Sequence, residues 1–268
     1  MKKIIALALT ALMLISLVAC NSNDSSDLTN IGDYAAPSYT CTTDTGVFTF
    51  KEGVGDTAII TGYKSSTTTP HEVKVPATVG EADDRIVVGI GEEAFKEAGA
   101  YVISVKFPET LTSIGDGAFL GCTYLTTVTL PNSLESIGTL AFYGCAKLTD
   151  VKFGDAPKLK YIGEFAFSDC KALESFTFTD NLETIDAAAF KGSAIKEAKL
   201  SESVTTIGDQ AFVDCKNLNT DGSITLTASV KKIGKHVFSA DIDYSFIKCP
   251  AGSYAEEYIN KLIEDAND

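Results

Sequence analysis

An isoleucine followed five residues later by a phenylalanine recurs along this chain and constrains its fold more than any other feature. Seven copies occur: Ile90/Phe95, Ile114/Phe119, Ile137/Phe142, Ile162/Phe167, Ile185/Phe190, Ile207/Phe212 and Ile233/Phe238. Successive copies start 22 to 26 residues apart. A unit of this length cannot bury its own apolar face, so neighbouring units must stack and share one core. The spacing therefore predicts a repeat solenoid.

Within each unit, apolar and polar residues alternate ahead of the Ile/Phe pair, which is the pattern of a short strand with one buried face. In the cleanest unit Val128 and Leu130 alternate with Thr127 and Thr129. The same alternation predicts strands at Ile103/Val105/Phe107, Val151/Phe153, Phe176/Phe178, Ala198/Leu200 and Ile224/Leu226. Stacked units place these strands side by side, so the sheet is expected to be parallel.

The rest of the unit predicts how the chain turns between strands. A glycine follows most of the repeat isoleucines, and we expect it to permit a tight corner, although Asp186 replaces it once. The Ala-Phe pair is expected to open one turn of α- or 3₁₀-helix, with the ring filling the interior. The predicted fold class is therefore an α/β repeat solenoid.

Both ends of the array carry segments that predict caps. Val47–Phe50 and Thr57–Thr61 alternate and predict a β-hairpin, and Gly80–Arg85 is a polar insertion that widens an irregular first rung. At the other end, Ser253 is the expected N-cap of an amphipathic helix that covers the last rung. Tyr254, Tyr258 and Leu262 are expected on one face of that helix. The predicted boundaries are a β-rich cap over 39–85, the repeats over 86–249 and a capping helix over 250–268.

The N-terminus has the layout of an export signal. Lys2 and Lys3 precede an apolar run, Ile4–Val18, that is too short for a comfortable membrane span. The run ends in Leu17-Val18-Ala19-Cys20, which resembles a bacterial lipobox, whose cysteine is lipidated and becomes the mature N-terminus. The alternative is an ordinary secretory signal with an incidental cysteine. We expect a signal peptide over 1–19, lipidation of Cys20, and a flexible polar tether over 20–38.

The charge balance narrows the range of partners. The chain has 36 acidic and 22 basic residues, a net charge of −14, and it contains no tryptophan. Such a balance argues against binding of nucleic acid or of an anionic membrane by the folded domain. Contact with a membrane is therefore expected through the lipid anchor alone.

The whole unit, Leu-x2-Val-x-Leu-Pro-x2-Leu-x2-Ile-Gly-x2-Ala-Phe-x2-Cys, resembles the BspA-like subfamily of leucine-rich repeats over about Gly53 to Glu257. The resemblance implies a surface protein of the kind found in bacteria and some protists, several of which act as adhesins toward host proteins or other cells. It carries no catalytic residues to transfer. The fifth copy departs from the pattern, with Asp186 for glycine and Ser193 for cysteine.

Four cysteines form a ladder of equivalent positions, three residues after the repeat Phe: Cys122, Cys145, Cys170 and Cys215. They either fill their rungs as small buried residues or pair between adjacent rungs, where the spacing suits a disulfide. Ser193 and Asp241 occupy equivalent positions, which favours free thiols. Cys41 and Cys249 lie near opposite ends and are not expected to meet.

No constellation in the sequence indicates an enzyme. His71 and His236 are far apart in rung position, and His236 is expected in an exposed turn. The cysteines lack zinc-site spacing, and no serine stands in a Gly-x-Ser-x-Gly elbow. Gly53-x-Gly55 is read as a hairpin turn rather than a phosphate loop, because no helix follows it. We expect no catalytic residue, no metal and no cofactor.

Two surfaces are candidates for partner binding. The first is a column of outward strand positions, which could equally be a plain solvated sheet. Its members are Ser104, Lys106, Thr127, Thr129, Asp150, Lys152, Ser175, Thr177, Glu197, Lys199, Ser223 and Thr225. The second is a small apolar patch of Leu120 and Tyr143, on neighbouring rungs, with Tyr124 close by.

Three hypotheses for function follow. The first is a monomeric cell-surface lipoprotein whose repeats bind a protein, from a host matrix or the bacterial envelope, in adhesion or host interaction. The second is a structural or assembly component of the bacterial envelope. The third is an accessory protein that captures glycans, which the lack of tryptophan disfavours.

Overall fold

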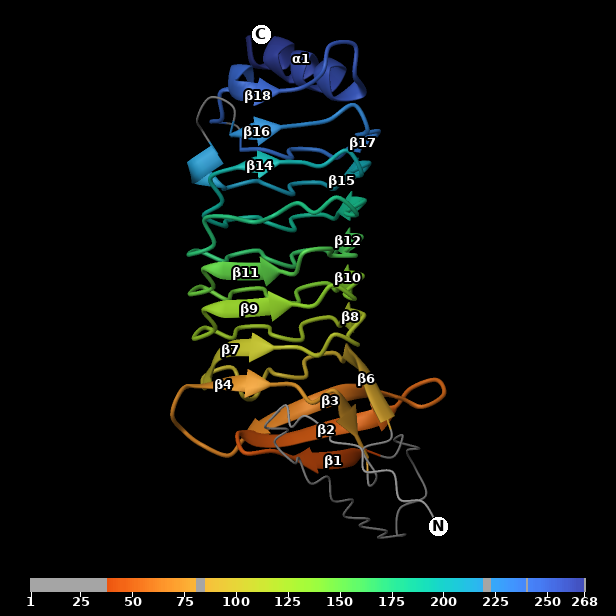
Figure 1. Cartoon of the computed structure of the whole chain (residues 1–268). Helices are drawn as coiled ribbons and strands as arrows, with labels where there is room; N and C mark the ends of the chain where they lie inside the picture. The colour runs from red at the N-terminus through yellow and green to blue at the C-terminus, as the bar shows by residue number, and fades with distance from the viewer. Residues whose placement is uncertain (1–37, 81–84, 219–222, 240, 268) are drawn as a thin grey trace, which may run out of the picture.

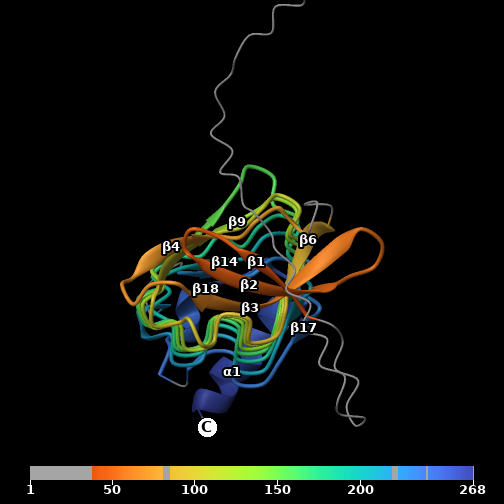
Figure 2. The same cartoon turned by 90° about the horizontal axis from the view of Figure 1, so that it is seen from below.

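The computed structural model describes residues 38–80, 85–218, 223–239 and 241–267. They form one elongated coil in which the chain winds through stacked rungs, with antiparallel strands at the N-terminal end and a helix at the C-terminal end (Figure 1). Seen along the coil axis, the rungs superimpose (Figure 2). The signal peptide, Cys20 and residues 20–37 of the expected tether lie outside the described residues, as do residues 81–84 of the polar insertion.

The repeat isoleucines form a parallel sheet along one side of the coil, which the sequence did not predict. Each of its strands has two residues and ends on a repeat Ile: β8 (Ser113–Ile114), β10 (Ser136–Ile137), β12 (Tyr161–Ile162), β13 (Thr184–Ile185), β15 (Thr206–Ile207) and β17 (Lys232–Ile233). They pair in chain order, with Ile beside Ile throughout. The sequence shows these positions only as an inward turn, because a two-residue strand is too short to display alternation.

The predicted strands form the other side of the coil, which we call the candidate face. It consists of two parallel sheets. One contains β4 (His71–Lys74), β7 (Val102–Lys106), β9 (Thr127–Leu130) and β11 (Asp150–Phe153), and the other contains β14 (Ala198–Lys199), β16 (Ile224–Thr225) and β18 (Ile247–Lys248). The expected strand at Phe176/Phe178 is wrong, because the structure has no strand there. The two sheets are therefore separated by one unpaired rung.

The predicted hairpin caps the N-terminal end. β2 (Gly46–Glu52) pairs antiparallel with β3 (Thr57–Ser65), and β1 (Tyr39–Thr42) adds to the outer edge of β2. On its other side β3 pairs parallel with β6 (Arg85–Ile90), which joins the cap to the isoleucine sheet and also carries the short β5 (Thr78–Val79). The cap and the repeats thus share one 11-stranded sheet.

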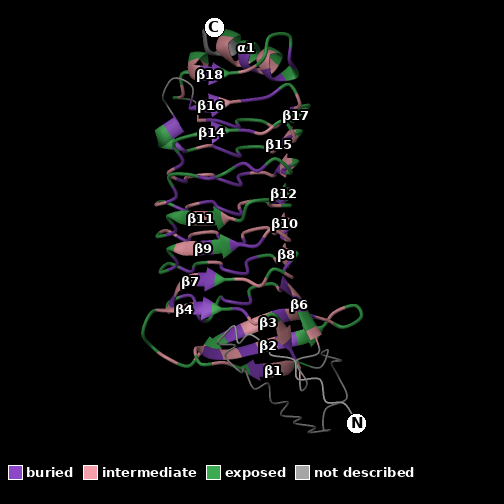
Figure 3. Cartoon of the chain, viewed as in Figure 1, coloured by how far each residue is buried: buried purple, intermediate pink, exposed green. Residues whose placement is uncertain are grey.

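A column of phenylalanine rings fills the coil. Consecutive repeat rings stack face to face with centroid distances from 4.5 Å, between Phe95 and Phe119, to 5.9 Å, between Phe212 and Phe238. In the middle, Phe142 lies 5.1 Å from both Phe119 and Phe167, at interplanar angles of 3° and 8°. Buried residues line the inside of the coil along its length (Figure 3). The stack confirms that the rings fill the interior.

The expected helical turn at the Ala-Phe pair is wrong, because the structure has hydrogen-bonded turns there. The described residues contain α1 (Tyr254–Asn267) and two 3₁₀ segments, η1 (Lys216–Leu218) and η2 (Tyr244–Phe246), as their helices. The residue two before each repeat Phe has a positive φ: Glu93, Gly117, Leu140, Phe165, Ala188, Gln210 and His236. This left-handed conformation costs an L-residue about 1–2 kcal/mol, and it coincides with a hydrogen bond to the next rung, as from Leu140 N–H to the Glu164 carbonyl, 2.8 Å.

The glycines after the repeat isoleucines do not serve the turn that the sequence suggested. Gly115, Gly138 and Gly163 are not among the residues with positive φ. Instead, the backbone of the preceding rung lies against them: a Cβ on Gly163 would stand 2.6 Å from the carbonyl carbon of Gly138. These glycines therefore permit close stacking of rungs rather than a left-handed corner.

The C-terminal helix is capped as predicted but presents a different face. The Ser253 hydroxyl accepts a hydrogen bond from Glu256 N–H at 3.2 Å, as expected of an N-cap residue. Ala255 and Ile259 are buried and Tyr258 donates to the Gly234 carbonyl at 2.8 Å, whereas Tyr254 is exposed, which corrects its expected place on the buried face. Among the described residues, no helix is long and apolar enough to cross a membrane.

Candidate functional site

The candidate face brings five of the predicted binding residues together. Lys106, Thr129 and Lys152 are register partners on β7, β9 and β11, and Thr127 is the partner of Asp150. Their side chains are exposed, except for half-buried Thr127. Because parallel strands lie about 4.7–4.9 Å apart, the residues form two straight columns.

The other two predicted residues of this face are separated from the five. Thr177 is exposed and lies in the unpaired rung. Lys199 is on β14, in the second sheet, beside Thr225. A surface that spans the whole candidate face is therefore interrupted between β11 and β14.

Charges on the candidate face neutralise one another locally. Lys106 lies 3.3 Å from Glu72, and Lys199 lies 2.8 Å from Glu197. All four side chains are well exposed, and such pairs contribute about 0–1 kcal/mol each. The lysines do not form a uniform basic surface, so main-chain groups and apolar contacts are the stronger candidates for recognition here.

The interruption lies where the interior carries too many rings. Phe176 and Phe178 both point inward in one rung, where the rung of β9 has Val128 and Leu130. Phe176 packs on Phe153 at 5.6 Å and on the repeat rings of Phe167 and Phe190 at 5.2 and 4.9 Å. Extra volume in a packed interior forces the backbone to move, and we attribute the loss of strand pairing to this crowding.

A groove of about 840 Å³ opens at the interruption. It is lined by residues 151–157 on one side and 177–181 on the other. Val151 and Phe153, expected to be buried, are only half-buried, whereas Val128 and Leu130 are fully buried. Phe153 and Leu159 are six positions apart in the sequence, whereas the equivalent Leu130 and Leu134 are four apart. The longer loop over residues 154–158, green in Figure 2, projects beyond the stacked rungs.

The second predicted surface is smaller than expected. Leu120 and Tyr143 are half-buried and lie on adjacent rungs, joined by the hydrogen bond from Gly121 N–H to the Tyr143 carbonyl. The Tyr143 ring packs edge-on against Phe165 at 6.5 Å. Tyr124 is exposed, and the Lys147 ammonium lies over its ring at 4.2 Å. These contacts direct both tyrosines toward other residues of the chain rather than into one shared apolar patch.

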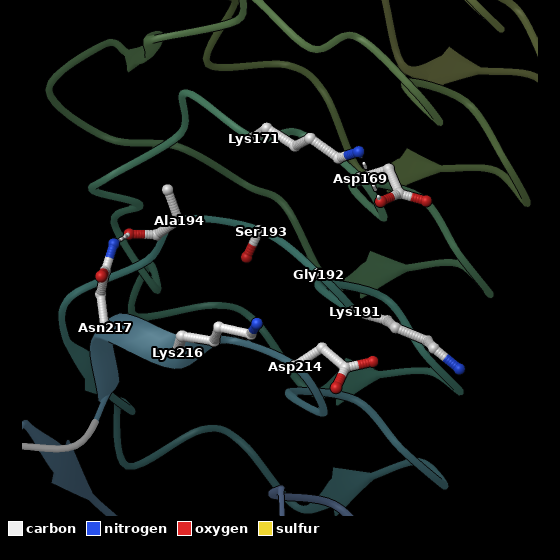
Figure 4. A pocket seen from close by; sticks show the side chains of 9 residues that line it. All are labelled: Asp169, Lys171, Lys191, Gly192, Ser193, Ala194, Asp214, Lys216 and Asn217. Atoms are coloured by element: carbon white, nitrogen blue, oxygen red, sulfur yellow. Dashed lines mark hydrogen bonds and ion pairs between the residues drawn. The ribbon is translucent and has the colours of Figure 1, made fainter.

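The fifth rung is one residue short and leaves a polar notch of about 480 Å³ (Figure 4). Its charged groups interact largely with their neighbours: Lys171 lies 3.8 Å from Asp169, and the Lys191 ammonium donates to Gln210 at 3.1 Å. Ser193, at its base, is buried, with its hydroxyl 3.3 Å from the Cys215 sulfur. The Ser193 hydroxyl is therefore shielded from solvent by its rung.

The ladder cysteines are free and buried, which confirms the packing hypothesis. Each thiol donates to the carbonyl of the repeat Phe one rung earlier, at 3.3 Å for Cys145 and Cys170 and 3.0 Å for Cys215. Burial raises the pKa of the Cys122 thiol to about 12 and that of Cys215 to about 11. Thiols in this state are poor nucleophiles.

We expect alkylation of the folded protein at about pH 8 to spare the four ladder cysteines, because their thiols are protonated and shielded from reagent. Cys249, which is half-buried, should react first among the free cysteines of the described residues. Site-resolved mass spectrometry after iodoacetamide treatment measures the order, with urea-unfolded protein as the control in which all five react. Equal labelling of Cys145 and Cys249 in the folded state would contradict this assignment.

Tyr161 and Asp186 form a hydrogen bond at the corner where glycine is replaced. The Tyr161 hydroxyl donates to Asp186 Oδ2 at 2.6 Å, and Ala187 N–H donates to Asp186 Oδ1 at 2.7 Å. The bond to the carboxylate, together with burial, raises the pKa of Tyr161 to about 12. The neutral phenol is thus the form that the folded state favours.

A raised pKa in the folded state stabilises the protein below the ordinary tyrosine value of 10.0, and this contribution is lost as the pH rises through about 12. We therefore expect the tyrosinate absorbance of the wild-type protein to contain a late titration step, near pH 12, that is missing in Tyr161→Phe. Between pH 10 and about pH 12, the melting temperature of Tyr161→Phe should also fall less steeply than that of the wild type. Superimposable titration curves would rule the bond out.

No group of three or more His, Cys, Asp or Glu side chains is arranged to hold a metal within the part of the chain that the structure describes. His71 contacts Tyr63, with Nε2 2.9 Å from the phenol oxygen, and His236 is exposed in a left-handed turn, as expected. Sequence reasoning missed the groove beside β11. The long spacing from Phe153 to Leu159 and the Phe176/Phe178 doublet are the two signals that could have indicated it.

The stacked rungs, short parallel strands and repeat core define a leucine-rich-repeat solenoid. Residues 88–219 match the family described as the BspA type leucine rich repeat region, in six copies. Residues 88–219 therefore belong to the BspA-type leucine-rich repeat family, as their sequence motif indicated. None of the curated proteins matches this sequence.

Two solved structures are similar to this chain. The Leucine Rich Repeat protein of T. pallidum is 26% identical, with a TM-score of 0.64, and the match covers 80% of this chain and 92% of that protein. A leucine rich cell surface protein from Faecalibacterium prausnitzii is 24% identical, with a TM-score of 0.51, over 76% of this chain and 74% of that one. Both share the solenoid fold. Leucine-rich-repeat solenoids typically serve as binding scaffolds rather than enzymes.

Proposed function

We propose that this chain is an exported cell-surface lipoprotein whose leucine-rich repeats bind a protein partner, in adhesion or host interaction. In this proposal residues 1–19 are the signal peptide, Cys20 carries the lipid, and residues 20–38 tether the domain. Residues 39–85 and 250–268 close the two ends of the repeats over 86–249. Leucine-rich repeats of the BspA type and the cell-surface description of the similar F. prausnitzii protein support it.

The groove beside β11 is the observation that carries the binding role. It exposes Val151 and Phe153 on a face whose equivalent residues in β9 are fully buried. Partly exposed apolar and aromatic side chains in a recess are the usual centres of protein recognition. Lys152 and Thr177, two of the predicted binding residues, line the same groove.

A binding screen of the mature domain tests this role. The immobilised domain is exposed to host-matrix proteins, bacterial envelope proteins and glycans, with heat-unfolded domain as the control. Saturable binding of a protein that the unfolded control lacks supports the proposal. A glycan hit without any protein ligand overturns it in favour of glycan capture, and a light-scattering mass above that of the monomer favours an assembly role.

Lipid attachment is tested separately in a bacterial host. Metabolic labelling with a fatty acid should mark the wild-type chain and not Cys20→Ser, and the wild type should fractionate with membranes. Labelling that persists in Cys20→Ser would remove Cys20 as the anchor, whatever the outcome of the binding screen.

A further inference from the structure

Backbone hydrogen bonds connect the paired rungs of the candidate face in a regular pattern. An inward-facing residue donates its N–H to a backbone carbonyl of the next rung. Thus Ala198 donates to Ser223 at 2.7 Å, Leu200 to Thr225 at 3.0 Å and Leu226 to Lys248 at 2.8 Å. Val75 donates to Lys106 in the same way at 3.0 Å.

The pattern stops at β11. Val151 and Phe153 occupy the equivalent donor positions, and their acceptors would be the carbonyls of Ser175 and Thr177. Within the described residues, no strand pair or backbone hydrogen bond joins β11 to residues 175–178. β11 therefore presents an unpaired edge in the middle of the coil, where a strand edge is normally covered.

The groove combines this edge with apolar side chains. Half-buried Val151 and Phe153 lie along it with Phe178 from the opposite side, and residues 154–157 and 179–181 form its ends and walls. Its charged residues are one lysine, Lys152, and two aspartates, Asp155 and Asp180. With so little net charge, recognition here depends on the main chain and on apolar contacts.

We propose that this groove accepts an extended peptide segment of a protein partner, which pairs as an added strand with the edge of β11. The peptide carbonyls accept hydrogen bonds from the N–H groups of Val151 and Phe153, and its alternate apolar side chains pack on Phe153 and Phe178. This mode of recognition takes affinity from the main chain and specificity from side-chain pockets. The proposal rests on the proposed protein-binding function and names its site and the form of its ligand.

The probe is an array of peptides of about eight residues, the length of an ordinary strand, in which apolar residues alternate with threonine or serine. Each peptide is also made with alternate backbone amides N-methylated, which prevents strand pairing while keeping the side chains. Thr177→Trp fills the groove, and Thr112→Trp places the same side chain at an exposed threonine next to β8, on the opposite side of the coil. Circular dichroism confirms that both variants are folded.

Peptides should bind the wild type and Thr112→Trp alike. N-methylation should weaken binding by about tenfold or more, because the methyl groups prevent the peptide backbone from pairing with β11. Thr177→Trp should weaken binding to a similar extent, because its ring occupies the groove. Absence of peptide binding, or binding indifferent to both changes, overturns the proposal. If a protein partner found in the screen binds Thr177→Trp as tightly as the wild type, the groove is not the binding site. The proposed protein-binding function would still stand.

Amide hydrogen exchange of the unmodified chain gives a second readout. Val151 and Phe153 amides should exchange at least about tenfold faster than those of Val128 and Leu130, because unpaired edge groups open with little cost. Addition of a binding peptide should slow them selectively. Equal protection of all four amides in the free protein would show that β11 has no open edge.

Discussion

Replacing Phe142 by alanine should lower the free energy of unfolding by about 3–5 kcal/mol, the usual cost of removing a fully buried ring. Phe142 has no exposed surface and stacks on Phe119 and Phe167, both at 5.1 Å. The cavity cannot be filled easily, because the neighbouring rungs are held by hydrogen bonds such as that from Phe142 N–H to the Ala166 carbonyl, 2.8 Å. Urea unfolding of the mature domain, followed by circular dichroism, measures the loss.

Tyr143→Ala is the matched control, since it removes a half-buried ring at the next position. Its ring has a single aromatic neighbour, Phe165, so we expect a loss of about 1 kcal/mol. Similar losses for the two variants would mean that the phenylalanine column does not hold the rungs together. In a solenoid each unit is stabilised by its neighbours, so the loss at Phe142 should also reduce the cooperativity of unfolding.

Gly163→Ala should cost about 1–3 kcal/mol, the range for overfilling a well-packed site. The added Cβ would lie 2.6 Å from the Gly138 carbonyl carbon and 2.8 Å from Thr139 N, and both neighbours are backbone atoms. Relief requires the two rungs to separate, which lengthens the bond from Gly163 N–H to the Ile137 carbonyl, now 2.9 Å. Thermal unfolding of the two proteins measures the difference.

Gly144→Asp is the control for this prediction. At Gly144 the backbone conformation favours glycine but a Cβ has room, whereas at Gly163 a Cβ has no room. Gly144 has a φ of 69° and open space around the site of a Cβ. Asp169 and Asp214 occupy the equivalent positions at φ values of 57° and 60°. The loss for Gly144→Asp should therefore be smaller than that for Gly163→Ala. The reverse order would show that these two glycine positions differ in backbone freedom rather than in contact distance.

The candidate site could be predicted only in part. Alternation along single strands was enough to place Lys106, Thr129 and Lys152 in one column, because parallel stacking repeats the same position in every rung. It could not show that Thr177 lies at an interruption, since the Phe176/Phe178 doublet has the same alternating pattern as a paired strand. Whether two rings fit into one rung depends on the space that Phe153, Phe167 and Phe190 leave for them. These three side chains come from other parts of the sequence, so the alternating pattern of one strand does not contain that information.

The sequence by itself determined the stacked repeat, the parallel strands, the phenylalanine column and the buried thiols. Each of these follows from the local period, because every rung meets neighbours of the same composition. The tertiary structure alone decided the close approach at Gly163, the left-handed corner at Leu140, the exposure of Tyr254 and the open edge of β11. These depend on distances between atoms of different rungs, and no period along one chain contains those distances.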